Sequence, residues 1–144
     1  MNGRHRLVLR VGDWATLGDD AMSVRRAVFV VEQGIDESLE IDAHDRHSIH
    51  AVVRDGELPV ATGRLLPDGR IGRMAVLVPY RRAGVGGRVL ARLIEIAEAR
   101  GDATIELSSQ AYVCAFYERH GFERYGPVHD DEGIPHQAMR RKLR

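Results

Sequence analysis

A glycine-rich turn between an apolar run and a helical pattern is the feature that most constrains this fold. The turn reads Arg81-Arg82-Ala83-Gly84-Val85-Gly86-Gly87-Arg88 and follows the apolar run Met74–Val78. A helix that begins in such a turn exposes its first N–H groups, which lack partners within the helix and favour phosphate oxygens. Glycines allow a close backbone approach, and arginines would donate paired hydrogen bonds to phosphate. The sequence therefore predicts a ligand that carries a pyrophosphate.

The turn matches neither of two common nucleotide-binding signatures. A P-loop closes with a Lys-Ser/Thr pair, which this turn lacks, and a dinucleotide fold requires a third glycine where Val89 stands. The turn does resemble the Arg/Gln-x-x-Gly-x-Gly/Ala segment of the GNAT superfamily of acetyl-CoA-dependent acyltransferases, with Arg81, Gly84 and Gly86 in the matching positions. A loop that only leads into a helix would also carry glycines, so further segments are needed.

Other segments support the resemblance. Residues 115–122 resemble the Phe-Tyr-Glu-x-x-Gly-Phe segment near the end of GNAT domains. Residues 28–33, 40–42 and 131–136 resemble the ElaA-like subgroup of that superfamily. The resemblance extends from about Leu7 to Leu143 and implies an N-acetyltransferase that uses acetyl-CoA as a co-substrate and needs no metal.

The order of the predicted elements agrees with an α/β fold. Apolar periodicity predicts a strand, a helix, three strands, a helix, a strand, a helix and two strands, which indicates a sandwich around one mixed sheet. The resemblance implies a GNAT-like three-layer arrangement, in which helices cover both faces of a mixed, mostly antiparallel sheet. The length of 144 residues suits one domain, and we assign a single N-acetyltransferase domain to residues 1–144.

Caps, turns and periodicity predict the boundaries of the elements. In the first half we expect a strand over 6–11, a helix capped by Asp19 or Asp20 and ended by Gly34, a loop over 35–48 that can hold a short helix, a hairpin over 50–62 and a strand over 71–78. In the second half we expect a helix from Val85 to Gly101, a strand over 104–108, a helix capped by Ser108 or Ser109 that runs to His120, and two strands around an Asp-rich turn.

Charge and cysteine content limit the expected partners. Lys plus Arg equals Asp plus Glu, 21 of each, so no net charge attracts nucleic acid or an anionic membrane. Cys114 is the only cysteine, which excludes an intrachain disulfide and fits a reducing compartment. The sequence has no membrane-length apolar run and no apolar secretion signal, so we expect a cytoplasmic protein. A homodimer is compatible with these features.

Tyr117 is the candidate acid of the implied reaction. Acetyl transfer to an amine needs a neutral amine, a donor for the developing oxyanion and an acid for the departing thiolate. A phenol with a pKa of about 10 keeps its proton at neutral pH, and the resemblance implies this role for a tyrosine in this helix. A packed aromatic side chain is the alternative interpretation of Tyr117.

The resemblance also implies the contacts to acetyl-CoA. Backbone N–H groups of the strand Met74-Ala75-Val76 are implied to polarise the thioester carbonyl. Gln110 stands where many GNAT proteins have an asparagine that touches the cofactor, and this departure leaves its contact open. The residues implied to bind acetyl-CoA are Met74, Ala75, Val76, Arg81, Arg82, Gly84, Val85, Gly86, Gly87, Gln110 and Tyr117.

The base that deprotonates the amine has five candidates in the sequence. They are Glu32, Asp42, Asp45, Glu106 and His136. A carboxylate or an imidazole can take the proton directly or through water. Glu32 and His136 lie in ElaA-like segments, and Glu32 is the first candidate, with substrate binding or bracing of a loop as its alternative role.

Two other groups have simpler explanations than chemistry. Cys114 lies three residues before Tyr117, which would allow a thiol relay, but a small buried side chain is the simpler interpretation. His44, His47 and His50 repeat every third residue, and this spacing fits neither a helical metal pair nor one face of a strand. We therefore expect no metal site.

The acidic segment Asp36–Asp45 bears on the identity of the acceptor. Its charge suggests a cationic acceptor such as a polyamine, an aminoglycoside or a lysine side chain, but a solvated loop explains it equally well. The sequence thus predicts direct transfer from acetyl-CoA to a primary amine of a small molecule or protein, in a ternary complex. The alternatives are a catalytically silent acetyl-CoA/CoA-binding regulatory module and a nucleotide-binding structural protein, which the missing P-loop lysine disfavours.

Overall fold

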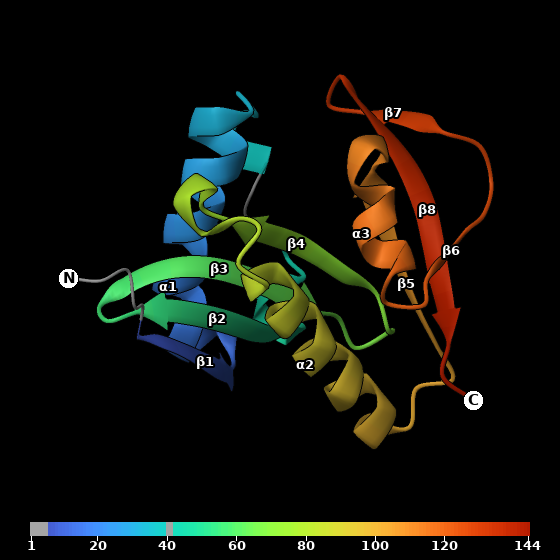
Figure 1. Cartoon of the computed structure of the whole chain (residues 1–144), viewed down its shortest axis with the longest axis horizontal. Helices are drawn as coiled ribbons and strands as arrows, with labels where there is room; N and C mark the ends of the chain where they lie inside the picture. Colours follow the sequence, from blue (N-terminus) through green and yellow to red (C-terminus); the bar gives the residue numbers. More distant parts are fainter. Residues whose placement is uncertain (1–5, 40–41) are drawn as a thin grey trace.

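Two tight turns shape the first sheet, because each places a glycine where the backbone adopts a left-handed conformation. Gly56 has φ of 60° between β2 (Ile49–Asp55) and β3 (Leu58–Leu65), and Gly69 has φ of 93° between β3 and β4 (Ile71–Val76). The strand order is β1-β2-β3-β4, with every pair antiparallel, and β1 spans 7–12. The computed structural model describes residues 6–39 and 42–144 (Figure 1).

A second sheet is built from the C-terminal strands. β8 (Ile134–Lys142) pairs with β5 (Thr104–Gln110), and it also pairs with the short strands β6 (Glu123–Arg124) and β7 (His129–Asp131). All of these pairs are antiparallel. The C-terminal strands around an Asp-rich turn are therefore present as predicted.

The two sheets meet at one point and then diverge. Within the described part of the chain, a single parallel bridge between Arg70 and Glu106 joins the edge of β4 to β5. The predicted α/β fold, with mostly antiparallel strands and helices on both faces, is confirmed. The predicted single mixed sheet is divided into two antiparallel sheets that touch at this parallel bridge. Beyond the bridge, β4 and β5 separate towards the start of helix α2 (Figure 1).

A β-bulge in β4 accompanies the divergence. The register of the β3–β4 ladder shifts between Thr62 and Arg64, so Arg73 and Met74 together lie opposite Gly63. Arg73 has φ of 51°, a left-handed conformation that is uncommon for a residue with a side chain. A bulge bends its strand and increases the local twist, which turns β4 away from β5.

The first helix begins earlier than predicted. α1 (Trp14–Arg25) is capped by Asp13, whose carboxylate accepts a hydrogen bond of 2.9 Å from the backbone N–H of Thr16. The predicted cap at Asp19 or Asp20 is wrong, since both residues lie inside the helix. Asp13 already satisfies one of the free N–H groups of the first turn, so no later cap is needed.

α1 continues directly into the π-helix η1 (Arg26–Glu32), where the sequence predicted an ordinary helix. Gly34, with φ of 74°, follows the end of this helix as predicted. The wider π-helical turn keeps Val28 in the core and leaves Phe29 and Gln33 at a cleft described below.

The segment that follows, predicted as a loop that can hold a short helix, contains two short 3₁₀ helices. These are η2 (Glu37–Leu39) and η3 (Asp45–His47), and a third 3₁₀ helix, η4 (Val78–Tyr80), follows β4. Glu40 and Ile41, which belong to the segment that resembles the ElaA-like subgroup, lie outside the described residues.

β5 extends two residues beyond its predicted end. Its ladder with β8 runs as far as the pair Gln110 and His136. Ser108 and Ser109 are therefore strand residues, and their predicted role as helix caps is wrong. Pairing across the sheet outweighs the local preference of serine for a cap, because each ladder position satisfies backbone groups on both strands.

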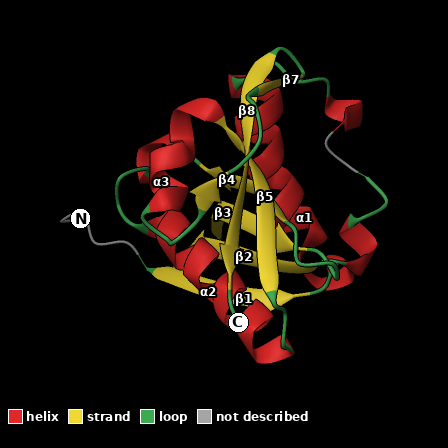
Figure 2. Ribbon diagram, turned by 90° about the vertical axis from the view of Figure 1, so that its right-hand side faces the viewer, coloured by secondary structure: helices red, strands yellow, loops and turns green. Residues whose placement is uncertain are grey.

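The helices of the second half complete the layers. α2 (Val85–Arg100) begins at Gly84 and ends at Gly101, as predicted, and lies on the opposite face of the first sheet from α1 (Figure 2). The 3₁₀ helix η5 (Ala111–Val113) leads into the short helix α3 (Cys114–Glu118) beside the second sheet. No helix in the described ranges is both long and apolar enough to cross a membrane. The buried stripe of α2 consists of Val85, Val89, Leu90, Leu93, Ile94 and Ala97.

α2 packs closely on the first sheet at Gly63. A Cβ atom added there would overlap Met74 Sδ and would lie 2.9 Å from Val89 Cγ1 and 3.2 Å from Leu93 Cδ1. The absence of a side chain therefore lets α2 and the bulged strand approach each other over this position.

Gly63→Ala is expected to lower the free energy of unfolding by about 1–3 kcal/mol, because overpacking forces the neighbouring side chains to shift. Gly72→Ala is the matched control on β4, since no atom lies within 4 Å of its added Cβ. Urea unfolding of both variants measures the difference. Equal stability of the two variants would contradict this packing.

A buried ion-pair cluster fastens the segment before β2 to α1 and β3. Arg25 donates hydrogen bonds of 2.9 and 3.0 Å to Asp45, and Arg64 donates a bond of 2.9 Å to the same carboxylate. Arg64 also donates two bonds to Asp42, at 2.8 and 2.9 Å, and Arg73 donates one at 3.2 Å. Burial opposes ionisation of both carboxylates, but the arginines outweigh it, so the pKa of Asp42 is lowered to about 2 and that of Asp45 is also lowered.

This cluster is expected to lose its contribution to stability in acid. The pKa of Asp42 is lower in the folded than in the unfolded chain, so stabilisation is complete above about pH 4 and decreases as the pH falls towards about 2, by about 1–2 kcal/mol. Asp42→Asn should lessen this dependence, whereas Asp19→Asn, on the exposed face of α1, should follow the wild type. Urea unfolding at several pH values provides the test, and the same dependence in all three proteins would contradict it.

Candidate active site

The divergence of β4 and β5 opens a cleft of about 1150 Å³. β4 and the glycine turn form one wall, while β5 and α3 form the other. The π-helix η1 and the β7–β8 hairpin lie at its opposite opening. The cleft therefore brings together segments that are far apart in the sequence, including most of the residues that the resemblance implied.

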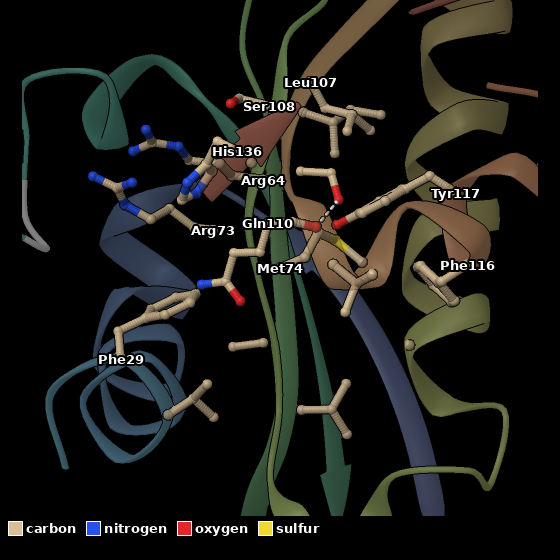
Figure 3. Close-up of a pocket in the computed structure, with 18 of the residues that line it drawn as sticks. Phe29, Arg64, Arg73, Met74, Leu107, Ser108, Gln110, Phe116, Tyr117 and His136 are labelled. Carbon is tan, nitrogen blue, oxygen red and sulfur yellow. Dashed lines mark hydrogen bonds between the residues drawn. The ribbon is translucent and has the colours of Figure 1, made fainter. Parts of the chain in front are cut away.

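The strands divide the cleft into two sides. Side chains alternate along a strand, so Leu107 of β5 faces α3 while Ser108 and Gln110 face away from it. Figure 3 shows Tyr117 on the side of α3, and Gln110 extends on the other side towards Phe29 of η1. These regions are called the α3 side and the η1 side below.

The glycine turn supplies free backbone donors at one end of the cleft. Gly84 precedes α2 with φ of 76°, and its carbonyl accepts the bond from the N–H of Arg88. The N–H groups of Val85, Gly86 and Gly87 thus belong to the first turn, where a helix offers no internal acceptors. This is the geometry of an anion cradle.

Packing beneath the cradle explains the need for glycine. A Cβ added at Gly86 would lie 3.3 Å from Val76 Cγ2 and 3.7 Å from Phe116 Cζ. Arg82 lies in the same turn with φ of 67°, so its left-handed conformation helps the chain to reverse before α2. The backbone here can approach a ligand closely because no side chain covers it.

Arg81 is held in a fixed position beside the cradle. Its guanidinium donates hydrogen bonds of 2.7 and 2.6 Å to the carboxylate of Glu32 and one of 2.9 Å to the carbonyl oxygen of Val76. The hydrogen bonds from Arg81 lower the pKa of Glu32, despite partial burial. Glu32 is not among the described residues that line the cleft.

Tyr117 extends from α3 into the cleft, with its ring packed among aromatic neighbours (Figure 3). Its ring centroid lies 5.0 Å from that of Phe116 and 6.0 Å from that of Phe122. Only 8% of Tyr117 is exposed, and burial raises the pKa of its phenol above the usual value. The hydroxyl therefore keeps its proton through the physiological pH range.

Gln110 spans the cleft on the η1 side. Its amide nitrogen donates a bond of 2.9 Å to Gln33, and the amide of Gln33 donates in return at 3.3 Å. The pair links η1, which packs on the first sheet, to the end of β5 in the second. The structure thus gives Gln110 a partner on the η1 side, away from Tyr117.

Polar groups at the hairpin and on β5 complete the η1 side. Nδ1 of His136 lies 2.8 Å from the carbonyl oxygen of Ile134, and the hydroxyl of Tyr125 donates a bond of 2.6 Å to Glu106. His129, 3.5 Å from Ser108, was not singled out from the sequence. The alternation of side chains along residues 104–110 is a sequence signal that Glu106, Ser108 and Gln110 share one face of the strand. No pattern in the sequence indicates that His129 lies beside this strand.

Of the remaining sequence candidates, Cys114 and His50 have structural roles, whereas His44 lines the cleft. Cys114 is 1% exposed and belongs to the main core. His50 lies 2.8 Å from the carbonyl oxygen of Asp45, and its ring packs 5.0 Å from that of Trp14. Within residues 6–39 and 42–144, no group of three or more His, Cys, Asp or Glu side chains is arranged to hold a metal ion.

The cleft fits the parts of an acyl-CoA in order. Backbone donors at α2 suit a pyrophosphate, and beyond the Arg70–Glu106 bridge the facing edges of β4 and β5 form no ladder with each other in the described residues. Such an open strand edge can hydrogen-bond the amides of a pantetheine chain. Tyr117 then lies on the same side as the cradle, within the gap that would receive the thioester.

Comparison with known proteins agrees with this geometry. The family described as the acetyltransferase (GNAT) domain matches residues 15–143. An uncharacterized N-acetyltransferase, YjcF of Bacillus subtilis, is 40% identical over 124 residues, or 83% of this chain and 89% of that protein. The crystal structure of Escherichia coli ElaA is similar to this chain, with a TM-score of 0.85 and 26% sequence identity. The matched region covers 94% of this chain and 99% of the ElaA chain. The crystal structure of an acyl-CoA N-acyltransferase from Pseudomonas aeruginosa is also similar, with a TM-score of 0.81 and 29% sequence identity. The match covers 94% of this chain and 99% of that protein's chain. The chain belongs to the GNAT family of acetyltransferases.

Proposed function

We propose that this acetyltransferase moves the acetyl group of acetyl-CoA directly to a primary amine in a ternary complex. One observation carries the proposal: the cleft passes between β4 and β5, with the anion cradle and Tyr117 on one side. On the η1 side, a polar part of the same cleft is lined by Gln33, Gln110 and His136, and we call this part the chamber. Two substrates can approach the same point from opposite sides. No covalent acetyl-enzyme is needed, and Cys114 is buried within the core.

Binding of acetyl-CoA is assigned to the backbone of two segments. The first N–H groups of α2, at Val85, Gly86 and Gly87, would receive the pyrophosphate, with the charge of Arg82 beside them. Backbone N–H groups along 74–76 would hold the pantetheine chain and polarise the thioester carbonyl. These donors are fixed by the fold before substrate arrives, so little reorganisation opposes binding.

Tyr117 is assigned as the acid that protonates the departing thiolate. Its raised pKa means that the phenol is protonated when the thioester arrives. Desolvation within the cleft also disfavours a free thiolate, so a proton donor close to the sulfur contributes more to catalysis. The aromatic packing around Tyr117 fixes the ring in position for this transfer.

Glu32 receives a different role from the one that the sequence suggested. Its carboxylate is paired with Arg81, and a low pKa makes a carboxylate a weak base. In our proposal Glu32 is a positioning residue that holds Arg81 against the carbonyl of Val76 at the edge of the cradle. Gln110 likewise acts through Gln33, by fixing the chamber wall on the η1 side.

The charge of the acidic segment does not define the acceptor in this proposal. Asp42 and Asp45 already pair with Arg25, Arg64 and Arg73, so their charge is compensated within the protein. The acceptor is therefore assigned only as a primary amine of a small molecule or protein. A silent CoA-binding module is not favoured, because one related protein is named an N-acetyltransferase and a similar structure is named an acyl-CoA N-acyltransferase.

Release of free thiol from acetyl-CoA tests the function directly. We expect the purified protein to release CoA in the presence of at least one member of a panel of polyamines, amino acids, aminoglycosides and lysine peptides. A blank without amine corrects for hydrolysis. Tight binding of CoA with no release for any amine would contradict transferase activity on these classes.

Tyr117→Phe is expected to reduce kcat by about 10²–10⁴, because the variant lacks the proton donor but keeps the packed ring. The dissociation constant of acetyl-CoA should stay within about twofold of the wild-type value, since binding rests on backbone donors. Calorimetry gives the affinity and thiol release gives the rate. An unchanged kcat would contradict the assignment of Tyr117 as the acid.

A further inference from the structure

A base for the acceptor amine must lie on the η1 side, away from the thiolate. An amine that attacks the thioester loses a proton, and the group that receives it needs an available lone pair. Glu32 is outside the cleft and paired with Arg81. Asp42 and Asp45 are held by arginines, and both carboxylates have lowered pKa values because the arginines outweigh burial.

Glu106 is placed poorly for this role. It lines the cleft at the bridge with Arg70, where the two sheets are still joined. Its carboxylate also accepts the 2.6 Å bond from Tyr125. Of the five candidates in the sequence, Glu106 and His136 line the cleft, and His136 lies in the β7–β8 hairpin, away from the bridge and from the Tyr125 bond.

The strand ladder places His136 beside the chamber. His136 lies directly opposite Gln110 in the β5–β8 ladder, and opposite residues of an antiparallel pair project from the same face of the sheet. Since Gln110 extends to the η1 side, His136 does so too (Figure 3). Tyr117 lies on the other side of β5, so the two groups approach the gap from opposite faces.

The backbone of β8 fixes the tautomer of His136. A carbonyl oxygen only accepts hydrogen bonds, so the 2.8 Å contact with Ile134 requires the hydrogen on Nδ1. The neutral imidazole then carries its lone pair on Nε2. The ring sits on a strand and is half-buried, so its orientation is set by the sheet.

We propose that His136 is the general base of the transfer and that its Nε2 takes the proton from the acceptor amine on the η1 side. This assignment rests on the proposed function. The N–C bond forms as the C–S bond breaks, Nε2 receives the amine proton, and the Tyr117 hydroxyl gives its proton to sulfur. Solvent then removes the proton from His136 and returns one to Tyr117, so the enzyme is restored without another reactant.

The charged and titratable surroundings of His136 come from several elements. His129 of β7 lies with its ring centroid 6.1 Å away, and the cleft also carries Arg73 of β4 and Glu106 of β5. Asp131 and Glu132 lie at the tip of the hairpin. A test of His136 therefore needs a control histidine outside the cleft and a readout other than pH alone.

His136→Gln is expected to lower kcat/KM for the best amine of the panel by about 100-fold, with the affinity for acetyl-CoA and the Tm unchanged. Added imidazole should raise the rate of His136→Ala by at least about tenfold, because it supplies the missing base. The matched control is His47→Gln, an exposed histidine of η3 that is not among the described residues that line the cleft. This control should retain activity within about threefold of the wild type.

The outcomes separate this assignment from the proposed function. Activity of His136→Gln within about threefold of wild type, or a loss that imidazole does not repair in His136→Ala, would overturn His136 as the base while transfer by the wild type still stands. Absence of amine-dependent release in the wild type would instead contradict the function itself. Repair of His136→Ala by imidazole, with no such effect on His47→Gln, would support the assignment.

Discussion

The separation of β4 from β5 is the constraint on which the rest of the structure depends. The two strands meet at the Arg70–Glu106 bridge and then diverge, which leaves two facing strand edges without a common ladder. The bulge at Arg73 turns β4, and Gly63 allows α2 to pack against the bulged strand. The opening is therefore built into the packing of the core and does not depend on a mobile loop.

This geometry also divides the chemistry between two faces. The cradle at α2 and the phenol of Tyr117 lie together, where a pyrophosphate and a thiolate would need them. The η1 side is framed by a π-helix, by the amide pair of Gln33 and Gln110, and by the buried arginine–aspartate cluster. Unpaired burial of such charges would be costly, so the cluster is stabilising only while it is complete. Its integrity holds the wall of the chamber in place.

The local signals in the sequence predicted the parts of the site that depend on one segment. Gly84 and Gly101 mark the two ends of α2, as predicted, and the apolar stripe of this helix is buried. The hairpin turn at Gly56 was also predicted from the local sequence. Features that depend on contacts between segments were missed: Ser108 and Ser109 joined a ladder with β8, and the bulge at Arg73 has no residue that signals it. The π-helical geometry of 26–32 was likewise invisible, because its apolar pattern also fits an α-helix.

We expect the thioester of acetyl-CoA to bind in the gap between β4 and β5, and a crystal structure with bound CoA tests this most directly. The pyrophosphate should contact the N–H groups of Val85, Gly86 and Gly87, and the CoA sulfur should lie within hydrogen-bonding distance of the Tyr117 hydroxyl. A CoA molecule bound elsewhere, or one whose sulfur lies on the η1 side of β5, would contradict the central claim.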